Sequence, residues 1–562
     1  MNTKLHDEHR EREHFFGSAK TVAVITLVSR VFGMLRDMAI TSLGANRLTD
    51  AYGLAFQIPN LFRRLFGEGA LTSAFVPIFT ETSERSGFEK ACKLLSNAMA
   101  LLAVALTVIM LAAEIVFLVT ALLPGPEDRK LLMILASIMF PYMVTVCLLA
   151  MGSAALNCRG HFAYPAAAPI ILNIFGITAA WWVAPALREN LSDKLIIVAI
   201  SVTSAGVVQL AAVLWLLHKS GFSLKLRLRP VEAGIRPMIR LLAPVLLGLG
   251  FLQISELLAT IISWNLTAVS AHPTINIFGW VLQRPLAEGV IVRVNAARAM
   301  YQFPMGVLAI PVGVAVFPLL TRYAARGDIR NICNSIGRAL RLSLMEGIST
   351  GVGLFILAEP IIKLIYMRRN FTAADAAQSA FILKMYALGM PAYCSYQILT
   401  RAFYSFKDTV TPLKISCWLV FLNLGMLVTM LWIPSLGAGA FGLSTAITFI
   451  INAVVLLYLL RRRLNLRQGS GGEMGRFGGR KILISVLRTI AGSAAMAAVL
   501  YLLQYQLGDV RNWIVVAVCV PAGAITFLAV VQLLGAPELG ELMGGIKAAK
   551  EEPEADISQQ GK

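Results

Sequence analysis

Apolar residues occur in long runs separated by short polar segments, from the first fifty residues almost to the end of the chain. Most runs have 18 residues or more, which is close to the length an α-helix needs to cross the hydrocarbon core of a bilayer. Helices satisfy their own backbone hydrogen bonds in lipid, so the runs predict membrane-spanning helices. Fourteen are predicted, at 18–43, 50–80, 91–123, 130–157, 165–186, 194–218, 237–268, 288–321, 332–358, 376–406, 411–433, 439–461, 481–505 and 512–534.

The segments between these helices alternate between basic and nearly uncharged. "HKSGFSLKLRLRP" and "RRRLNLRQGSGGEMGRFGGRK" are basic, whereas "IPSLGAG" carries no charge. Basic loops stay on the cytoplasmic side, so both termini are predicted to be cytoplasmic. The basic segment "KLIYMRRNFT" falls on the predicted outer side, where a short amphipathic hairpin is expected to accommodate it.

The chain repeats its own spacing at an offset of about 250 residues. Pro141 precedes Asn173 by 32 residues, and Pro391 precedes Asn423 by the same interval. Because six helices per repeat is an even number, the two halves have the same orientation, as in transporters with parallel repeats. The predicted fold is therefore an all-α polytopic membrane protein with two six-helix lobes in parallel repeat and a C-terminal helix pair.

The loops and the repeat together predict six segments. They are a cytoplasmic N-terminal tail at 1–17, an N-lobe at 18–222, a C-lobe at 223–464, a basic Gly-rich linker at 465–480, the helix pair at 481–536 and a cytoplasmic C-terminal tail at 537–562. The helix pair lies outside the duplication and is expected to have a task of its own.

Composition supports the membrane assignment and excludes several other classes. The chain is 57% hydrophobic and 14% charged, whereas soluble domains have about 25% charged residues. The net charge of +19 comes largely from loops between spans, so nucleic acid is not an expected partner. The seven cysteines and six histidines show no ligand spacing, and no catalytic set or nucleotide motif occurs. We therefore expect no metal, no cofactor and no enzymatic activity.

Charged residues nevertheless occur inside the first predicted span, in "SRVFGMLRD". Arg30 lies about 16 Å along a helix that starts near Ala19, and Arg36 and Asp37 follow it. A charge at the bilayer centre costs at least about 2.5–3.5 kcal/mol, so these residues need a polar cavity or a protein environment.

The second predicted span and the second half add further charges: Asp50, Arg63, Arg64, Glu68, Arg293 and Arg298. Arg64 and Glu68 are four residues apart and can pair. Arginines outnumber carboxylates in this set, which predicts a positively charged cavity between the lobes. The guanidinium group binds phosphate oxygens in a bidentate manner and keeps its charge, so the expected cargo is anionic and phosphorylated.

The candidate substrate-binding residues are Arg30, Arg36, Arg63, Arg64 and Arg298, and the candidate structural or gating charges are Asp37, Asp50 and Glu68. The alternative interpretation is that these charges snorkel or neutralise one another. Glu256 in the seventh span could bind a coupling cation, but a paired or protonated carboxyl is the more economical interpretation.

Several stretches closely resemble the MurJ/MviN family of lipid II flippases, which belongs to the multidrug/oligosaccharidyl-lipid/polysaccharide exporter superfamily. They are "SRVFGMLRD", "TDAYGLAFQIPNLFRRLFGEGALTSAFVPIF", "ALNCRGHFAYPAAAPIILNI", "YQFPMGVLAI" and "AFYSFKDTVTPLKI", and they run in order over nearly the whole chain. The resemblance implies a cationic cavity between two lobes, with Arg30, Arg36 and Arg63 as its arginines. It also implies a lipid-tail groove on the terminal helix pair.

The resemblance further implies that the protein moves undecaprenyl-diphosphate-linked peptidoglycan precursor across the bacterial cytoplasmic (inner) membrane by alternating access. The expected partners are lipid II and membrane lipids, with the cell-wall synthesis machinery as a further candidate, and the protein is expected to act as a monomer. Coupling to the membrane potential or to a monovalent cation stays open.

This sequence departs from the family pattern at three places, and one of them is Ala259 in the seventh span, where some relatives carry an acid for sodium. Arg298 stands one residue earlier than the family's arginine before "YQFP", which turns it about 100° around the helix. The segment 270–289 is a longer outer loop than is usual. Three alternative functions remain at this point: a flippase for another polyprenyl-diphosphate-linked oligosaccharide, a cation-coupled multidrug exporter, and a membrane scaffold without transport.

Overall fold

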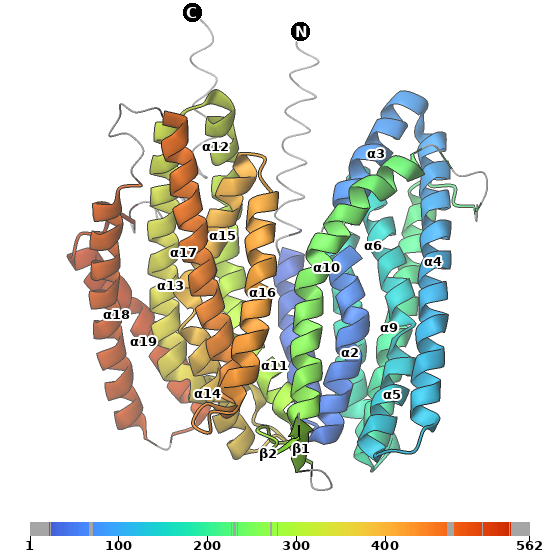
Figure 1. Ribbon diagram of the computed structural model, residues 1–562, viewed down its shortest axis with the longest axis horizontal. Coiled ribbons are helices and arrows are strands. Elements are labelled where there is room, and N and C mark those ends of the chain that lie inside the picture. Colours follow the sequence, from blue (N-terminus) through green and yellow to red (C-terminus); the bar gives the residue numbers. More distant parts are fainter. Residues whose placement is uncertain are drawn as a thin grey trace, which may run out of the picture. The chain divides into compact units, whose positions relative to one another are not determined.

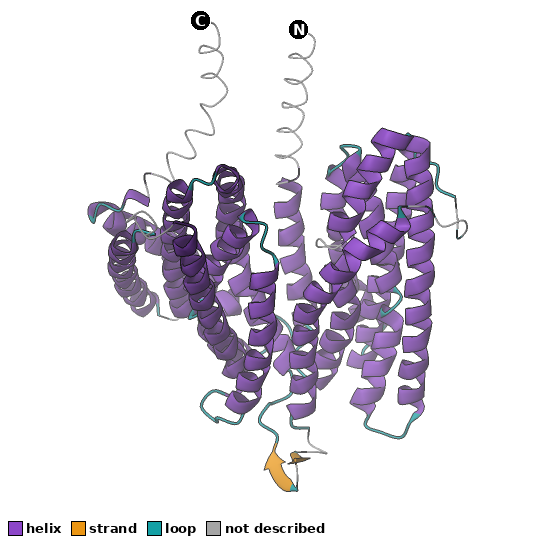
Figure 2. Cartoon of the chain, turned by 45° about the horizontal axis from the view of Figure 1, so that its top comes forward, coloured by secondary structure: helices purple, strands orange, loops and turns teal. Residues whose placement is uncertain are grey.

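The computed structural model describes residues 22, 24–66, 71–225, 228, 232, 234–269, 273–277, 279–468, 477–508, 510–538 and 540. These residues are almost entirely α-helical, with one small hairpin (Figure 2). The chain divides into two compact units, Met1–Val292 with Arg368–Thr372 and Arg293–Met367 with Ala373–Lys562.

The first unit begins with a helix over 24–41. The helices that follow it are α2 (Arg47–Leu65), α3 (Leu71–Ser86), α4 (Phe88–Leu122), α5 (Glu127–Met139), α6 (Tyr142–Cys158), α7 (Ala163–Thr178), η2 (Ala179–Val183), α8 (Ala184–Leu187), α9 (Leu191–Lys219) and α10 (Ile235–Leu266). Figure 1 labels most of them along the chain. After α10, the strands β1 (Thr274–Ile277) and β2 (Trp280–Gln283) form an antiparallel hairpin within the predicted long outer loop.

The second unit contains the remaining helices. They are α11 (Val290–Pro304), whose first turn belongs to the first unit, η3 (Met305–Ala309), α12 (Ile310–Arg326), α13 (Ile329–Tyr366), α14 (Ala373–Ala387), α15 (Met390–Ser405), α16 (Val410–Leu431), η4 (Gly437–Gly439), α17 (Ala440–Gln468), α18 (Gly479–Leu507) and α19 (Asn512–Leu533).

Each of the fourteen predicted spans coincides with helix in the structure, which confirms the all-α polytopic fold. In the part of the chain that the structure describes, ten helices are long and apolar enough to cross a membrane. The other four predicted spans coincide with the helix over 24–41, with α2 and α3, with α10, and with α14 and α15.

Two predicted spans are each divided into two helices near a proline. The segment at 130–157 breaks between α5 and α6, where Pro141 caps α6 and removes a backbone donor. The segment at 376–406 breaks between α14 and α15, and Pro391 lies in the first turn of α15. α2, in contrast, runs through Pro59 and ends at Leu65. Gly67, Gly69 and Glu68 lie outside the described residues.

The two halves use the same pattern of helix packing, which confirms the predicted repeat. In the first unit α4 packs on α5 and α6, and α9 packs on α5, α6 and α7. In the second unit α13 packs on α14 and α15, and α17 packs on α14, α15 and α16. These pairs correspond one to one along the sequence, with α5 and α14, α6 and α15, and α9 and α17 in equivalent places.

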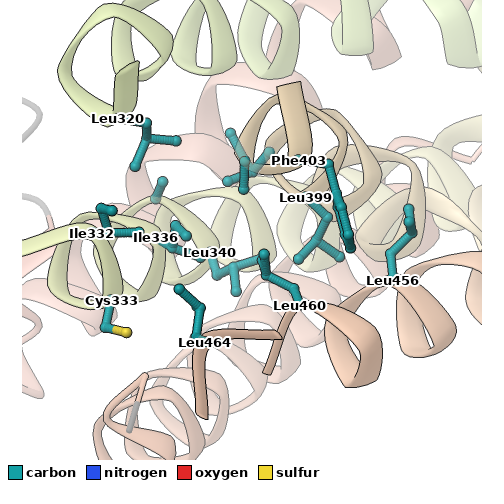
Figure 3. Packing of buried hydrophobic residues seen from close by; sticks show 13 residues of the cluster. Leu320, Ile332, Cys333, Ile336, Leu340, Leu399, Phe403, Leu456, Leu460 and Leu464 are labelled. Atoms are coloured by element: carbon teal, nitrogen blue, oxygen red, sulfur yellow. The ribbon is translucent and has the colours of Figure 1, made fainter. Parts of the chain in front are cut away.

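Apolar side chains fill the second unit in two clusters. The first joins α12, α13, α15 and α17 through residues such as Leu320, Ile336, Phe403 and Leu460 (Figure 3). The second joins α13 to the helix pair α18–α19 through residues such as Met345, Met496 and Phe527. The helix pair outside the duplication therefore packs on α13 of its own unit.

The prediction of a short amphipathic hairpin between the ninth and tenth spans is wrong. α13 and α14 are joined by only six residues, 367–372, which are too few for two antiparallel arms. The loop instead closes a turn from the Phe371 N–H to the Arg368 carbonyl and donates the Asn370 N–H to the Ser42 carbonyl at 3.2 Å.

The compact units do not follow the predicted lobe boundary at 222/223, because α10 and the hairpin belong to the first unit. The boundary at 222/223 follows from the internal repeat, whereas the compact units follow from packing. The lobe boundary therefore stays a prediction. The described ends of the 465–480 linker continue α17 to Gln468 and begin α18 at Gly479.

Candidate functional site

Arg30 lies on the exposed face of the helix over 24–41, together with Val24, Leu27 and Val31. Ser29 on the same helix accepts a hydrogen bond at its carbonyl from Asn173 Nδ2 of α7, at 3.2 Å. Arg30 itself makes no hydrogen bond or ion pair with any other residue that the structure describes. Its charge is therefore not neutralised by a described carboxylate.

Arg36, two turns further on, is held on three sides. Its Nη2 and Nε atoms donate to Asp37 Oδ1 at 2.8 and 3.2 Å, and its guanidinium lies 5.5 Å from the ring centroid of Phe56 on α2. Its aliphatic stem lies against Gly176 of α7, where a Cβ atom would come within 2.9 Å of Arg36 Cγ. The guanidinium is thus neutralised and oriented, while its side chain keeps 20% exposure.

Tyr142 brings Arg36 and Arg63 into one cluster. This tyrosine, at the start of α6, is fully buried, and its hydroxyl interacts electrostatically with both guanidinium groups. The hydroxyl has no hydrogen-bond partner within the described ranges. Arg63 donates from Nε to Asn60 Oδ1 at 2.7 Å, one turn back on α2.

Arg64 is neutralised by an acid from a distant part of the sequence. Its Nη1 lies 2.5 Å from Glu256 Oε2 and 3.3 Å from Gln253 Oε1, both on α10. The interpretation of Glu256 as a paired carboxyl is therefore confirmed. The predicted pairing of Arg64 with Glu68 lies outside the described residues, and a substrate contact by Arg64 stays a prediction.

Asp50 is buried in the first turns of α2 and caps another helix. Its two carboxylate oxygens accept the N–H groups of Gly289, at 2.8 Å, and Val292, at 3.1 Å, where α11 begins. The first N–H groups of a helix have no intrahelical acceptor and carry partial positive charge, so a carboxylate stabilises them.

In the second unit, the two arginines of α11 contact an acid and a tyrosine. Arg293 is buried and pairs with Asp375 at 2.9 Å. Arg298, one and a half turns later on α11, interacts electrostatically with the hydroxyl of Tyr393. Tyr393 belongs to an aromatic group in which the ring of Tyr301 lies 4.6 Å from Tyr386 and 5.2 Å from Tyr393.

The structure thus brings Arg36, Asp37 and Arg63 together in the first unit and places Arg30 on the same helix as Arg36. Buried Tyr52 of α2, which interacts electrostatically with Arg36, belongs to this cluster with Asn60 and Tyr142. Sequence reasoning missed these three residues because an uncharged polar residue in an apolar run gives no charge signal. The arrangement offers planar donors beside buried hydroxyls, which suits the oxygens of a phosphate or diphosphate.

Comparison with known proteins gives the same family as the resemblance above. The family described as "Lipid II flippase MurJ" matches residues 39–519. The chain belongs to the MurJ family.

Curated relatives in this family align over most of their length. The chain is 30% identical over 451 residues to "Probable lipid II flippase MurJ" of Rhizobium tropici, covering 79% of this chain and 80% of the relative. It is 28% identical to the protein of the same description from Vibrio cholerae, covering 92% and 95%. It is 29% identical to "Lipid II flippase MurJ" of Burkholderia cenocepacia, covering 80% and 84%. The MurJ family assignment therefore applies to most of the chain.

Solved structures show the same fold. A structure described as "Lipid II flippase MurJ, inward closed conformation" aligns with a TM-score of 0.72 at 22% identity, covering 91% of this chain and 98% of the other. An inward-facing multidrug resistance MATE family transporter aligns with a TM-score of 0.64 at 13% identity, covering 81% and 100%. This MurJ family member is therefore a multi-pass membrane protein with the fold that flippases and MATE transporters share.

Proposed function

We propose that this protein is a flippase that moves lipid II, an undecaprenyl-diphosphate-linked muropeptide, from the inner to the outer leaflet of the bacterial cytoplasmic membrane. The observation that carries the proposal is the guanidinium cluster of the first unit in a chain of the MurJ family. Its action is non-enzymatic, since translocation needs recognition and movement of the lipid but no bond cleavage.

The cluster matches the headgroup by charge and geometry. A diphosphate carries several oxygen acceptors, and an arginine can bind two of them with parallel N–H bonds. Arg30 supplies a guanidinium without a described carboxylate partner, and Arg36 supplies one whose orientation is set by Asp37 and Gly176. Arg63 is the third contact in the proposal. We further propose that Arg298 contributes from the C-lobe and that Arg64 is held by Glu256 at the edge of the site.

The proposed path is alternating access. The headgroup enters a cationic cavity between the lobes from the cytoplasm, while the polyprenyl tail stays in lipid along α18 and α19. Proline and glycine residues in α2 and in α11–α12 supply flexing points, and the π-helical turn η3 directly follows Pro304. Both termini are cytoplasmic in this proposal, the protein acts as a monomer, and it needs no cofactor.

The test is the outward accessibility of lipid II in cells depleted of the native flippase and supplied with variants of this chain. Arg30→Ala and Arg63→Ala are expected to lower accessible lipid II at least tenfold at equal expression. Arg85→Ala is the control, because Arg85 is an exposed arginine of α3 that forms an ion pair with Glu81 one turn earlier. Full activity of the combined Arg30→Ala and Arg63→Ala variant would contradict the proposal.

The same cells separate the alternatives. A flippase for another polyprenyl-diphosphate-linked glycan would leave lipid II inaccessible with the unaltered chain. A cation-coupled drug exporter is favoured only by the likeness to MATE structures, which shows the fold alone. The arginines of the helix over 24–41 and of α2 do not suit a cationic drug.

A further inference from the structure

A pocket lies within the second unit, separate from the cluster around Arg36. It has a volume of about 290 Å³ and lies between α12 and α15. Its lining residues are Phe317 of α12 and Tyr396, Gln397, Thr400, Arg401 and Tyr404 of α15. The volume is close to the lower end of the range for ligand sites, about 300 Å³.

The polar lining comes from one stripe of α15. Positions 397, 400, 401 and 404 are spaced three and four apart, so their side chains lie on one face of the helix. The opposite face carries Leu399 and Phe403, which are buried in the core with α13 and α17 (Figure 3). The core therefore fixes the rotation of α15 and so the direction of the polar stripe.

Arg401 is the only cation in this lining, and no carboxylate in the described part of the chain forms an ion pair with it. Its Nη1 atom is buried and has no hydrogen-bond partner among the described residues. The hydroxyl oxygen of the adjacent Thr400 is also buried and unpartnered within the same ranges. An arginine in a pocket lining that has no described carboxylate partner keeps its charge available to an anionic ligand.

Gly313 of α12 makes the room for this guanidinium. A Cβ atom at Gly313 would lie only 1.7 Å from Arg401 Nη1, so no other residue at 313 permits the observed position of Arg401. The guanidinium therefore occupies the space that a side chain at position 313 would fill, and Gly313→Ala would displace it without removing its charge.

The depth of the pocket suits a headgroup. Arg401 lies four residues before the end of α15, which is about 6 Å along the helix axis. The following loop carries Lys407, which adds positive charge at the same end. Basic pockets between helices near a membrane surface bind the phosphate of lipid headgroups.

We propose that the Arg401 pocket binds a phosphate group, donated by an anionic phospholipid or by a soluble phosphate. Arg401 supplies charge-assisted hydrogen bonds to the phosphate oxygens, and the side chains of Thr400, Gln397 and Tyr404 supply further donors around it. This site goes beyond the proposed flippase function, because none of its residues belongs to the cluster around Arg36.

The test measures binding to the purified full chain in detergent micelles. Two probes are used in separate arms: radiolabelled phosphatidylglycerol, with phosphatidylcholine as the lipid competitor, and radiolabelled inorganic phosphate. Arg401→Gln is expected to weaken the binding of the probe that occupies the site about tenfold. The reason is that the charge-assisted hydrogen bonds from the guanidinium to the phosphate oxygens are lost. Loss in the lipid arm alone assigns the site to a phospholipid, and loss in the phosphate arm alone assigns it to a soluble anion.

Two further variants keep the test decisive. Arg322→Gln removes an exposed arginine of α12 and is expected to bind both probes as the unaltered chain does. Gly313→Ala keeps the charge of Arg401 but displaces it, and it is expected to weaken binding as Arg401→Gln does. Thermal unfolding of each variant checks that it is folded. Equal binding by Arg401→Gln and Arg322→Gln in both arms would overturn the proposal.

Discussion

Gly176 determines where the side chain of Arg36 can lie. A guanidinium in a helix of this kind has several rotamers, and the absence of a Cβ atom on α7 leaves space for the arginine stem. Asp37 then holds the end of the side chain at 2.8 Å. The position of this charge thus depends on an uncharged residue 140 positions away in the sequence.

Replacing Gly176 by Val is expected to lower lipid II accessibility in cells nearly as much as Arg36→Ala, because the added side chain displaces the arginine stem. The measurement is the complementation assay with expression levels matched. Gly425→Val is the control, since a Cβ atom at Gly425 of α16 meets nothing within 4 Å. Equal activity of the two glycine variants would show that the position of Arg36 is not set by α7.

The ion pair between Arg64 and Glu256 predicts a compensating double variant. Arg64→Met removes this ion pair and is expected to cost about 1 kcal/mol of stability, a value reduced by the partial exposure of both side chains. Arg64→Met combined with Glu256→Met is expected to recover most of that loss, because both charges are removed together. Thermal unfolding in detergent of the single and double variants is the measurement. Additive losses in the double variant would contradict a direct pair.

The candidate arginines could be selected from the sequence, but their partners could not. Arg30, Arg36 and Arg63 stand out because charges inside apolar runs are rare. Glu256 lies 192 residues from Arg64, and Tyr142 is an ordinary residue of an apolar helix, so only the tertiary packing of α2, α6 and α10 reveals their roles. Asp37 and Glu256 each neutralise one arginine, so the net positive charge of the cluster is smaller than the sequence suggests.

At the scale of elements, the start of α11 depends on a residue of α2. Asp50→Ala removes both acceptors of the Gly289 and Val292 N–H groups and is expected to lower stability by about 2–3 kcal/mol. Asp50→Asn keeps one acceptor and should lose less. Thermal unfolding gives the comparison. The control is Asp328→Ala, which removes the exposed cap of α13 and is expected to have a smaller effect.

The loop between α15 and α16 predicts a dependence of stability on pH. Burial alone would raise the pKa of Asp408, but the backbone N–H and hydroxyl of Thr411 and the Arg463 guanidinium outweigh burial and lower this pKa below its ordinary value. A carboxyl with a depressed pKa stabilises the folded state above its unfolded pKa of about 3.9, and this contribution is lost as the pH falls further.

Asp408→Asn is therefore expected to be less stable than the unaltered chain at pH 6, with the difference shrinking between about pH 4 and pH 2. The measurement is the thermal unfolding midpoint of both proteins across that range. A difference that stays constant with pH would show that the ionised carboxylate is not the source of the stabilisation.

Length and hydropathy were sufficient to place every spanning helix, because these properties are set by the thickness of the bilayer. They were not sufficient to place the interruptions. The interruptions depend on local hydrogen bonding, which mean hydropathy does not reflect. They are the breaks at Pro141 and before Pro391 and the π-helical turns at Ala179–Val183 and Met305–Ala309. The prediction for the loop at 367–372 is wrong for a related reason. This loop is held by a hydrogen bond to Ser42, which is far away in the sequence.

For the whole molecule, the surplus of arginines in the spans predicts a response to voltage. An elementary charge that crosses the full potential gains about 2.3 kcal/mol per 100 mV. An inside-negative potential is therefore expected to raise the turnover of a fluorescent lipid II analogue in proteoliposomes by several fold, because it returns an empty cationic cavity inward. Arg30→Gln should reduce the effect. Unchanged turnover after the potential is collapsed would exclude this coupling.

The two halves of the chain share one packing pattern, yet the unpaired Arg30 and the cluster of Arg36, Asp37 and Arg63 belong to the first half alone. The shared framework and the side chains that select the cargo are thus separate features of this chain. Relatives that carry a different headgroup could then arise through a few substitutions on the helix over 24–41 and on α2, with the shared framework left intact.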